Sequence, residues 1–185
     1  MRIRELLKES KALLEGHFLL SSGLHSPNYL QCALMLQYPW MAEEAGKLLS
    51  EELKEFNADL IASPALGGIV IGQEVGRALK KRSIFGERLE KEMSLRRGFE
   101  VKAGERVIVV EDVVTTGKSV KEVIELVKKA KGEPVAVGCL VFRGKENPFE
   151  LPLKYLWHIE FPLYVPNNCP LCNKNVELVK PGSRK

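Results

Sequence analysis

The stretch that decides the fold reads VIVVEDVVTTGKS and runs from Val107 to Ser119. It begins with a run of β-branched apolar residues, which is typical of a buried parallel strand. Two adjacent carboxylates, Glu111 and Asp112, follow that run, and a short loop rich in threonine and glycine comes next. Because open α/β sheets bind ligands beyond the carboxyl ends of their strands, this order of residues predicts a ligand site here.

The loop from Thr115 to Ser119 is suited to binding an anion. It leads into a helical pattern, so backbone N–H groups and the helix dipole can face a phosphate. Gly117 lets the backbone approach a ligand closely, and the neighbouring hydroxyls add donors. The G-x-x-x-x-G-K spacing of a Walker A loop is absent. The alternative is an ordinary capped turn, but the acidic pair before the loop favours a site for a phosphorylated sugar.

A second anion-binding turn is predicted at SPALGG, residues 63–68. A strand end, two glycines and a helix start again place N–H groups around one point. A plain turn between strand and helix is the alternative for this segment taken alone. Two such turns on neighbouring strands would fit a ligand with a phosphate at each end.

Strand, loop and helix alternate along the chain, which predicts an α/β fold with a central, mostly parallel sheet flanked by helices. The apolar periodicity predicts helices over 2–15, from Pro39 onward, over 69–81 and over 118–130. Strands are expected at 58–62, 83–85, 107–110, 134–142 and 155–158. Residues 17–31 read as irregular or short-stranded, the charged segment 86–97 as a loop, and the tail beyond 145 as loosely structured.

Composition limits the function classes. The 185 residues are 45% hydrophobic and 28% charged, which predicts one globular domain spanning 1–185. The formal charge of +4 permits anionic ligands but lacks the concentrated basic stripe of a nucleic-acid-binding protein. The apolar runs are too short to span a membrane, and the N-terminus has no signal-peptide core. We therefore expect a cytoplasmic protein without a nucleic-acid or membrane partner.

The stretch from Val107 to Ser119 resembles the phosphoribosyl-pyrophosphate (PRPP) motif of the type I phosphoribosyltransferases. The resemblance implies the fold of that family, with a core of about 40–145 and a small hood from about 16–36 and the C-terminal tail. It also implies bound Mg²⁺, carried by PRPP, and a homodimer. The acidic pair would contact the ribose, with Asp112 counted as catalytic, and the loop would hold the 5-phosphate. The implied PRPP-binding residues are Glu111, Asp112, Val113, Val114, Thr115, Thr116, Gly117, Lys118, Ser119 and Arg88. The implied pyrophosphate loop consists of Ala65, Leu66, Gly67 and Gly68.

Residues 16–31, GHFLLSSGLHSPNYLQ, are similar to the N-terminal segment of the orotate-specific phosphoribosyltransferases. The similarity assigns Tyr29 and Leu30 to covering the base, although the aliphatic Leu30 cannot stack. It assigns Arg143 to the carboxylate of orotate and Thr115 to the base as well. Without the resemblance, the segment would be a structural hairpin and Arg143 a solvated surface charge.

The charged segment 87–97 lies where this family keeps its catalytic loop. Arg88 and Lys91 are the nearest matches to the basic residues of that loop, and we assign Lys91 a catalytic role. The loop has no histidine, and a solvated charged loop is the alternative. The implied activity is that of a pentosyltransferase, which joins the phosphoribosyl group of PRPP to orotate in pyrimidine synthesis. A purine-specific enzyme and a non-catalytic, PRPP-sensing regulator are the alternatives.

Two of the four cysteines, Cys169 and Cys172, are spaced as one half of a zinc site. His158 is a conceivable third ligand, and a dimer could combine two such pairs. A tight turn with two reduced thiols is the alternative. Cytoplasmic thiols are normally reduced, so no disulfide framework is expected.

Overall fold

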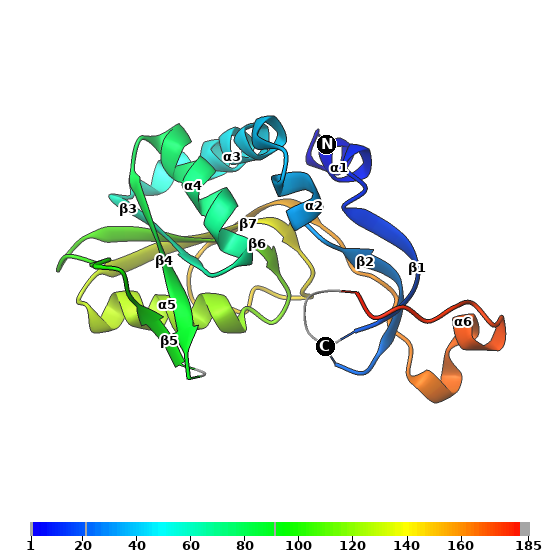
Figure 1. Cartoon of the computed structure of the whole chain (residues 1–185). Helices are drawn as coiled ribbons and strands as arrows, with labels where there is room; N and C mark the ends of the chain where they lie inside the picture. The colour runs from blue at the N-terminus through cyan, green and yellow to red at the C-terminus, as the bar shows by residue number, and fades with distance from the viewer. Residues whose placement is uncertain (1, 21, 91, 182–185) are drawn as a thin grey trace.

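The computed structural model describes residues 2–20, 22–90 and 92–181. Its centre is a six-stranded sheet in the order β5-β4-β3-β6-β7-β8 (Figure 1). Neighbouring strands run parallel except for the antiparallel pair β4–β5 at one edge. This arrangement confirms the predicted mostly parallel α/β sheet. The strands are β3 (Leu60–Pro64), β4 (Arg82–Leu89), β5 (Glu92–Leu95), β6 (Arg106–Val114), β7 (Glu133–Phe142) and β8 (Leu153–His158).

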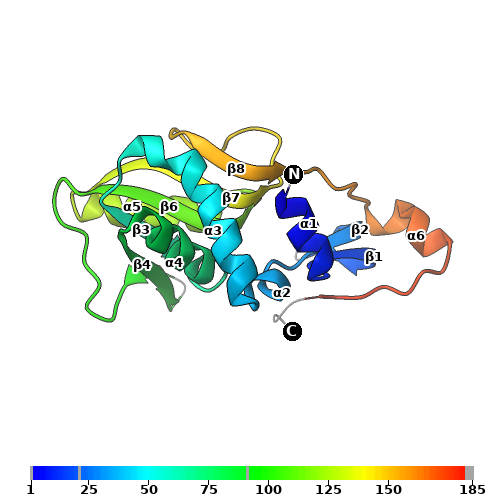
Figure 2. The ribbon, with the colours of Figure 1, turned by 90° about the horizontal axis from the view of Figure 1, so that it is seen from above.

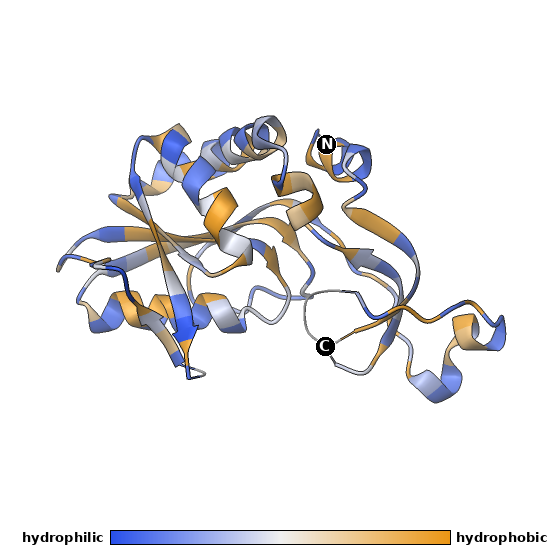
Figure 3. Cartoon of the chain, in the orientation of Figure 1, coloured by the Kyte–Doolittle hydropathy of each residue, from blue (hydrophilic) through white to orange (hydrophobic). Residues whose placement is uncertain are grey.

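Helices cover both faces of this sheet (Figures 1 and 2). The helices α3 (Pro39–Leu53) and α4 (Gly67–Leu79) lie on one face, and α5 (Lys118–Lys129) lies on the other. Alternate residues of β6 face opposite sides of the sheet. Ile108 lies in the core under α3 and α4, whereas Val109 packs with α5. Burial on both sides explains why β6 and β7 are largely hydrophobic along their length (Figure 3).

A second, two-stranded antiparallel sheet lies to one side of the core (Figures 1 and 2). It consists of β1 (Leu13–Leu19) and β2 (His25–Leu30), with α1 (Arg2–Glu9) before it. The tail, residues 160–181, runs back to it and forms bridges at both edges, Tyr164 with His25 and Val179 with Phe18. We call β1, β2, their connection and the tail the terminal module.

The remaining helical segments are short. They are α2 (Ala33–Leu36), the 3-10 turns Lys54–Phe56 and Pro166–Asn168, and α6 (Pro170–Asn173). The tail, for which the sequence predicts a loose structure, contains the turn Pro166–Asn168 and the helix α6. No helix in the described ranges is long and apolar enough to cross a membrane.

Two predicted elements were wrong. The expected helix 2–15 ends at Glu9, and Leu13 already belongs to β1, paired with Leu30. Lys11 has a φ of 54°, which stops the helix, and Gly16 lies inside the strand rather than capping a helix. The apolar Leu13 and Leu14 fit both patterns, so local periodicity could not place the boundary.

The segment 86–97, expected to be a loop, largely forms the hairpin of β4 and β5. In β5 the polar Glu92 and Ser94 alternate with the apolar Met93 and Leu95. Glu87 of β4 forms ion pairs with Arg96 and Arg97. The charges obscured a period of two that is typical of a half-exposed strand. The other expected helices and strands are present with shifted ends.

Candidate active site

The acidic pair lies at the carboxyl end of β6, where the strand gives way to the loop before α5. A small cavity of about 160 Å³ opens there, lined by Glu111 and residues 113–120. Gly117 has a φ of 71° at the start of α5, a conformation that glycine adopts without strain. The side chains of Thr115, Thr116 and Lys118 are exposed. The loop is therefore free to surround a small anion.

The second glycine turn meets the first at the carboxylates. It follows β3, which pairs directly with β6, as the two-turn prediction required. A β-carbon on Gly67 would lie only 2.7 Å from Oδ1 of Asp112, and one on Gly68 would lie 2.9 Å from the carbonyl oxygen of Val110. Only glycine permits this approach. The Ala65–Leu66 peptide bond within this turn is cis.

The environment of the two carboxyl groups disfavours their charged forms. Burial raises the pKa of both groups, and the carboxylate of Asp112 raises the pKa of Glu111 further. The backbone N–H of Val113 donates a 2.8 Å hydrogen bond to Oδ1 of Asp112, but no cationic side chain among the described residues is a leading cause of either shift. Hydroxyl donors or a bound cation would relieve this cost, so the site favours ligands that supply them.

Arg143 lies beside the loop that follows β6, residues 115–119, which is the predicted phosphate-binding loop. Its backbone N–H donates a 2.8 Å hydrogen bond to the carbonyl of Val114, which fixes it at the same edge of the sheet. Its guanidinium lies over the ring of Phe161, 4.7 Å from the centroid. Nε is buried and has no hydrogen-bond partner among the described residues. Burial lowers the pKa of Arg143, while nearby Tyr29 opposes that shift. A planar cation held in this way suits a carboxylate ligand.

The two predicted base-covering residues face opposite ways. Tyr29 is half-buried, with its ring 5.8 Å from that of Phe18. Leu30 is 6% exposed and packs in the hydrophobic core with residues of α1. Adjacent strand residues point to opposite faces, so only Tyr29 presents its side chain toward the Arg143 side.

The basic residues of the β4–β5 hairpin are tied to acidic neighbours where the structure describes them. Arg88 forms an ion pair with Glu122 of α5, and its Nη1 donates a 3.1 Å hydrogen bond to Oε1. Arg96 and Arg97 pair with Glu87. Lys91, the predicted catalytic lysine, lies outside the described residues. The roles of Arg88 and Lys91 therefore stay predictions.

A larger hollow lies elsewhere. It measures about 670 Å³ and lies between the outer side of α5 and residues 148–151. Neither acidic residue of β6 lines it, so chemistry rather than size identifies the candidate site. Sequence reasoning missed Phe161 and Glu122, which hold Arg143 and Arg88. Neither contact has a local signal, because each joins segments that only the fold brings together.

The chain is similar to known proteins over most of its length. Residues 35–162 match the family described as the phosphoribosyl transferase domain. Orotate phosphoribosyltransferase of Caldicellulosiruptor saccharolyticus is 52% identical over 98% of this chain and 95% of its own length. The Thermotoga maritima protein of the same name is 47% identical, covering 98% of both chains. Among solved structures, orotate phosphoribosyltransferase from Aeropyrum pernix matches with a TM-score of 0.74 and 26% identity, covering 86% of this chain and 94% of that one.

Proposed function

Because the chain belongs to the phosphoribosyltransferase family, in its orotate-specific branch, we propose that it transfers the phosphoribosyl group of PRPP to orotate. The bond between C1 of the ribose and the pyrophosphate oxygen breaks, and a bond from that carbon to N1 of orotate forms as the N1 proton passes to pyrophosphate or solvent. The products are orotidine 5′-monophosphate and pyrophosphate, in a step of pyrimidine synthesis. The reaction needs no nucleophilic side chain, and the described residues of the site include none paired with a base.

The observation that carries this proposal is the half-buried acidic pair at the point where two glycine turns meet. Glu111 and Asp112 accept hydrogen bonds from the ribose hydroxyls, and Asp112 is placed to favour the positive charge that develops on the ribose. Residues 113–119 hold the 5-phosphate, and residues 65–68 hold the pyrophosphate. Catalysis then rests on positioning and on electrostatic stabilisation of the leaving group.

The acceptor is recognised by a cation and an aromatic ring. Arg143 binds the carboxylate of orotate through two parallel hydrogen bonds, which its unpartnered Nε supports. Tyr29 covers the base, and Thr115 contacts it from the phosphate loop. Adenine and uracil lack the carboxylate, so binding either of them would leave a half-buried guanidinium without an anion.

We propose that Mg²⁺ takes part in the reaction. Glu111 and Asp112 present carboxylate oxygens, the ligand type that Mg²⁺ prefers, and a cation would offset the burial that raises their pKa. When bound with PRPP, the ion would neutralise charge on the departing pyrophosphate.

The β4–β5 hairpin completes the proposed site. Its Arg88 or Lys91 would approach the pyrophosphate and exclude water. In the family that the chain resembles, the loop at this position crosses to the active site of the neighbouring subunit, and on that basis we propose a homodimer. The exposed Trp40, 64% accessible, leaves an apolar side chain for such a contact. The four free thiols fit a reducing, cytoplasmic setting.

A panel of bases tests the function. Purified protein is incubated with PRPP, Mg²⁺ and orotate, adenine, xanthine or uracil, and pyrophosphate release is measured. We expect release with orotate alone. Release only with a purine would replace orotate as the acceptor. Saturable PRPP binding without product from any base would instead identify a regulator.

A further inference from the structure

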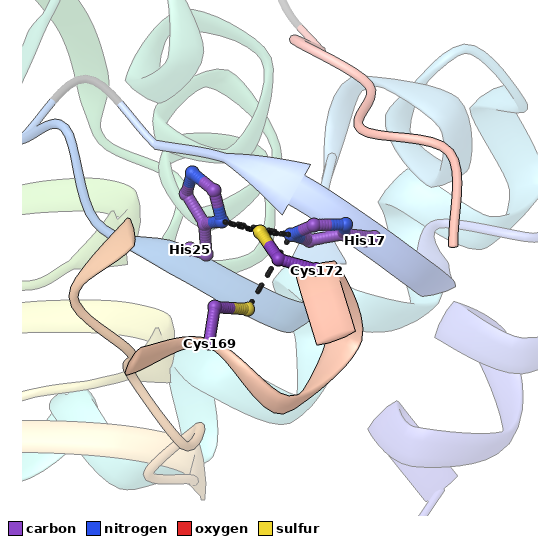
Figure 4. Close-up of side chains that lie close together, drawn as sticks. All are labelled: His17, His25, Cys169 and Cys172. Atoms are coloured by element: carbon purple, nitrogen blue, oxygen red, sulfur yellow. Dashed lines mark hydrogen bonds between the residues drawn. The ribbon is translucent and has the colours of Figure 1, made fainter. Parts of the chain in front are cut away.

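Four side chains converge outside the proposed active site, within the terminal module (Figure 4). His17 comes from β1 and His25 from β2, whereas Cys169 directly precedes α6 and Cys172 lies within it. Their ligand atoms all lie within 4.8 Å of one another. The sequence separates the histidines from the cysteines by more than 140 residues, so only the returning tail brings them together.

The separations match the edges of one coordination tetrahedron. Nε2 of His17 lies 3.5 Å from Sγ of Cys169 and 3.8 Å from Sγ of Cys172, and Nδ1 of His25 lies 3.4 Å from Sγ of Cys172. Typical zinc–sulfur and zinc–nitrogen bond lengths give a nitrogen–sulfur edge of about 3.6 Å. The two nitrogens are 2.8 Å apart and would separate to about 3.3 Å around an ion.

Contacts around the cluster orient its side chains for binding a metal ion. The Nδ1 atom of His17 lies 2.9 Å from the carbonyl oxygen of Val176 and can donate its proton there. This bond leaves the lone pair of Nε2 directed at the cluster, as the outer contacts of metal-binding histidines commonly do. His17, His25 and Cys169 are at most 4% exposed. The cysteines are free thiols, so no disulfide accounts for their proximity.

We propose that His17, His25, Cys169 and Cys172 bind one Zn²⁺ ion that fastens the tail to the β1–β2 hairpin. Two thiolates and two imidazoles form a set that favours tetrahedral Zn²⁺. Four protein ligands fill the coordination shell, so the ion is structural. An iron–sulfur cluster with the same ligands would place the imidazoles and thiolates on different irons, whereas here nitrogen and sulfur atoms share one tetrahedron.

The tail buries too little apolar surface to be held in place by packing alone. Between residues 160 and 181, Cys169 is the only buried residue. Leu163, Val165 and Leu178 are exposed, so apolar burial contributes little to holding this segment. Small regions without a core of their own are commonly stabilised by a metal ion. A zinc ion at this point would connect the last segment of the chain to the strands that carry His17 and His25.

The sequence prediction of His158 as a third ligand was wrong. Its Nε2 lies 2.8 Å from the carbonyl oxygen of Gly144, and its ring stacks on Phe142 with centroids 5.1 Å apart. A second cysteine pair from another subunit is also unnecessary, because one chain supplies all four ligands.

Metal analysis tests the proposal without reference to activity. The untagged, full-length protein is purified without chelators from zinc-supplemented cells, and zinc per chain is measured by mass spectrometry. We expect about one zinc ion per chain. The variants C169S, C172S and H25Q should each lose most of it. C139A is the matched control, because Cys139 is an equally buried thiol in the central sheet and should leave the zinc content unchanged.

Cobalt identifies the ligands even where a variant fails to fold. Wild-type protein stripped of metal is titrated with Co²⁺ and followed by absorption. A thiolate-to-cobalt charge-transfer band and intense visible bands of tetrahedral Co²⁺, both displaced by Zn²⁺, are expected. Wild-type protein that binds neither ion in this titration would overturn the proposal, as would zinc retained in full by C169S or a Cys169–Cys172 disulfide under reducing conditions.

Discussion

In the central sheet, Val107 to Val110 are all fully buried, whereas in the tail of the terminal module only Cys169 is. The sheet is held by aliphatic side chains that pack against helices on both faces. The terminal module buries the polar groups His17, His25 and Ser26 beside the apolar Phe18 and Leu30. Under the proposed function, the first region binds the donor and the second helps to cover the acceptor. The two substrates thus depend on regions that are stabilised by different interactions.

This difference makes the two halves of the site separable by mutation. Changes on β6 should affect PRPP and the chemical step, and changes around Arg143 or the terminal module should affect orotate.

Asp112→Asn should produce the largest loss. The substitution keeps the shape of the side chain but removes the charge that orients the ribose, so kcat/KM should fall by about 100- to 1,000-fold. Steady-state kinetics with both substrates measure the loss, and circular dichroism confirms the fold. The matched control is Asp59→Asn, at the opposite end of the sheet, where the side chain accepts a hydrogen bond from the N–H of Arg106. Equal losses in both variants would mean that Asp112 acts through stability alone.

Arg143→Lys should act on orotate alone. A lysine retains the charge but cannot form two parallel hydrogen bonds, so the KM for orotate should rise by about 10- to 100-fold. The KM for PRPP should stay unchanged. Arg4→Lys is the control, because Arg4 also lies over an aromatic ring, that of Trp157, at 5.2 Å. A parallel rise in the KM for PRPP would show that the donor and acceptor halves are not independent.

Removal of zinc should have a smaller effect in the same direction. His25 and Tyr29 lie on the same strand, β2, so loosening the terminal module should weaken the cover over the base. We expect the KM for orotate to rise by about 3- to 10-fold after chelation, as one weakened contact typically costs about 1 kcal/mol. Readdition of Zn²⁺ should reverse the change. If kcat and the KM for PRPP shift instead, the terminal module influences the donor side as well.

The same comparison explains what the sequence could predict. The strand β6, its acidic end and the loop into α5 form one continuous segment, so composition and order were enough to place them. The prediction that a second turn lies beside it needed only the rule that parallel strand ends meet at one edge. Both are local or nearly local features of the central sheet.

The terminal module was predicted less well, because its structure depends on contacts between distant segments. Leu13 and Leu14 suit a helix as well as a strand, and their pairing with β2 decides between them. The cysteine pair indicated half of a metal site, but His17 and His25 could be chosen over His158 only once the tail was seen to return. Leu30 was assigned to the base although its strand position turns it toward the core.

Glu111→Gln should give the smallest effect, a gain in stability that depends on pH. The folded state raises the pKa of Glu111, so the folded protein holds a proton that the unfolded chain releases at lower pH. Unfolded molecules then bind fewer protons, and the free energy of unfolding falls as pH rises above the ordinary carboxyl range. Glutamine removes this cost while still accepting the hydrogen bond from the N–H of Asp112.

Denaturant unfolding at a series of pH values measures this gain. We expect about 1 kcal/mol in mildly alkaline solution, a figure reduced because the group is only half-buried, and almost none in mildly acidic solution. Glu146→Gln, an exposed residue in the loop after β7, serves as the control. A Glu111→Gln variant that is less stable at every pH would mean that the carboxylate is satisfied in the folded protein. The acidic pair would then not lower the free energy of unfolding of the central sheet. The central sheet and the terminal module would differ only in how their side chains pack.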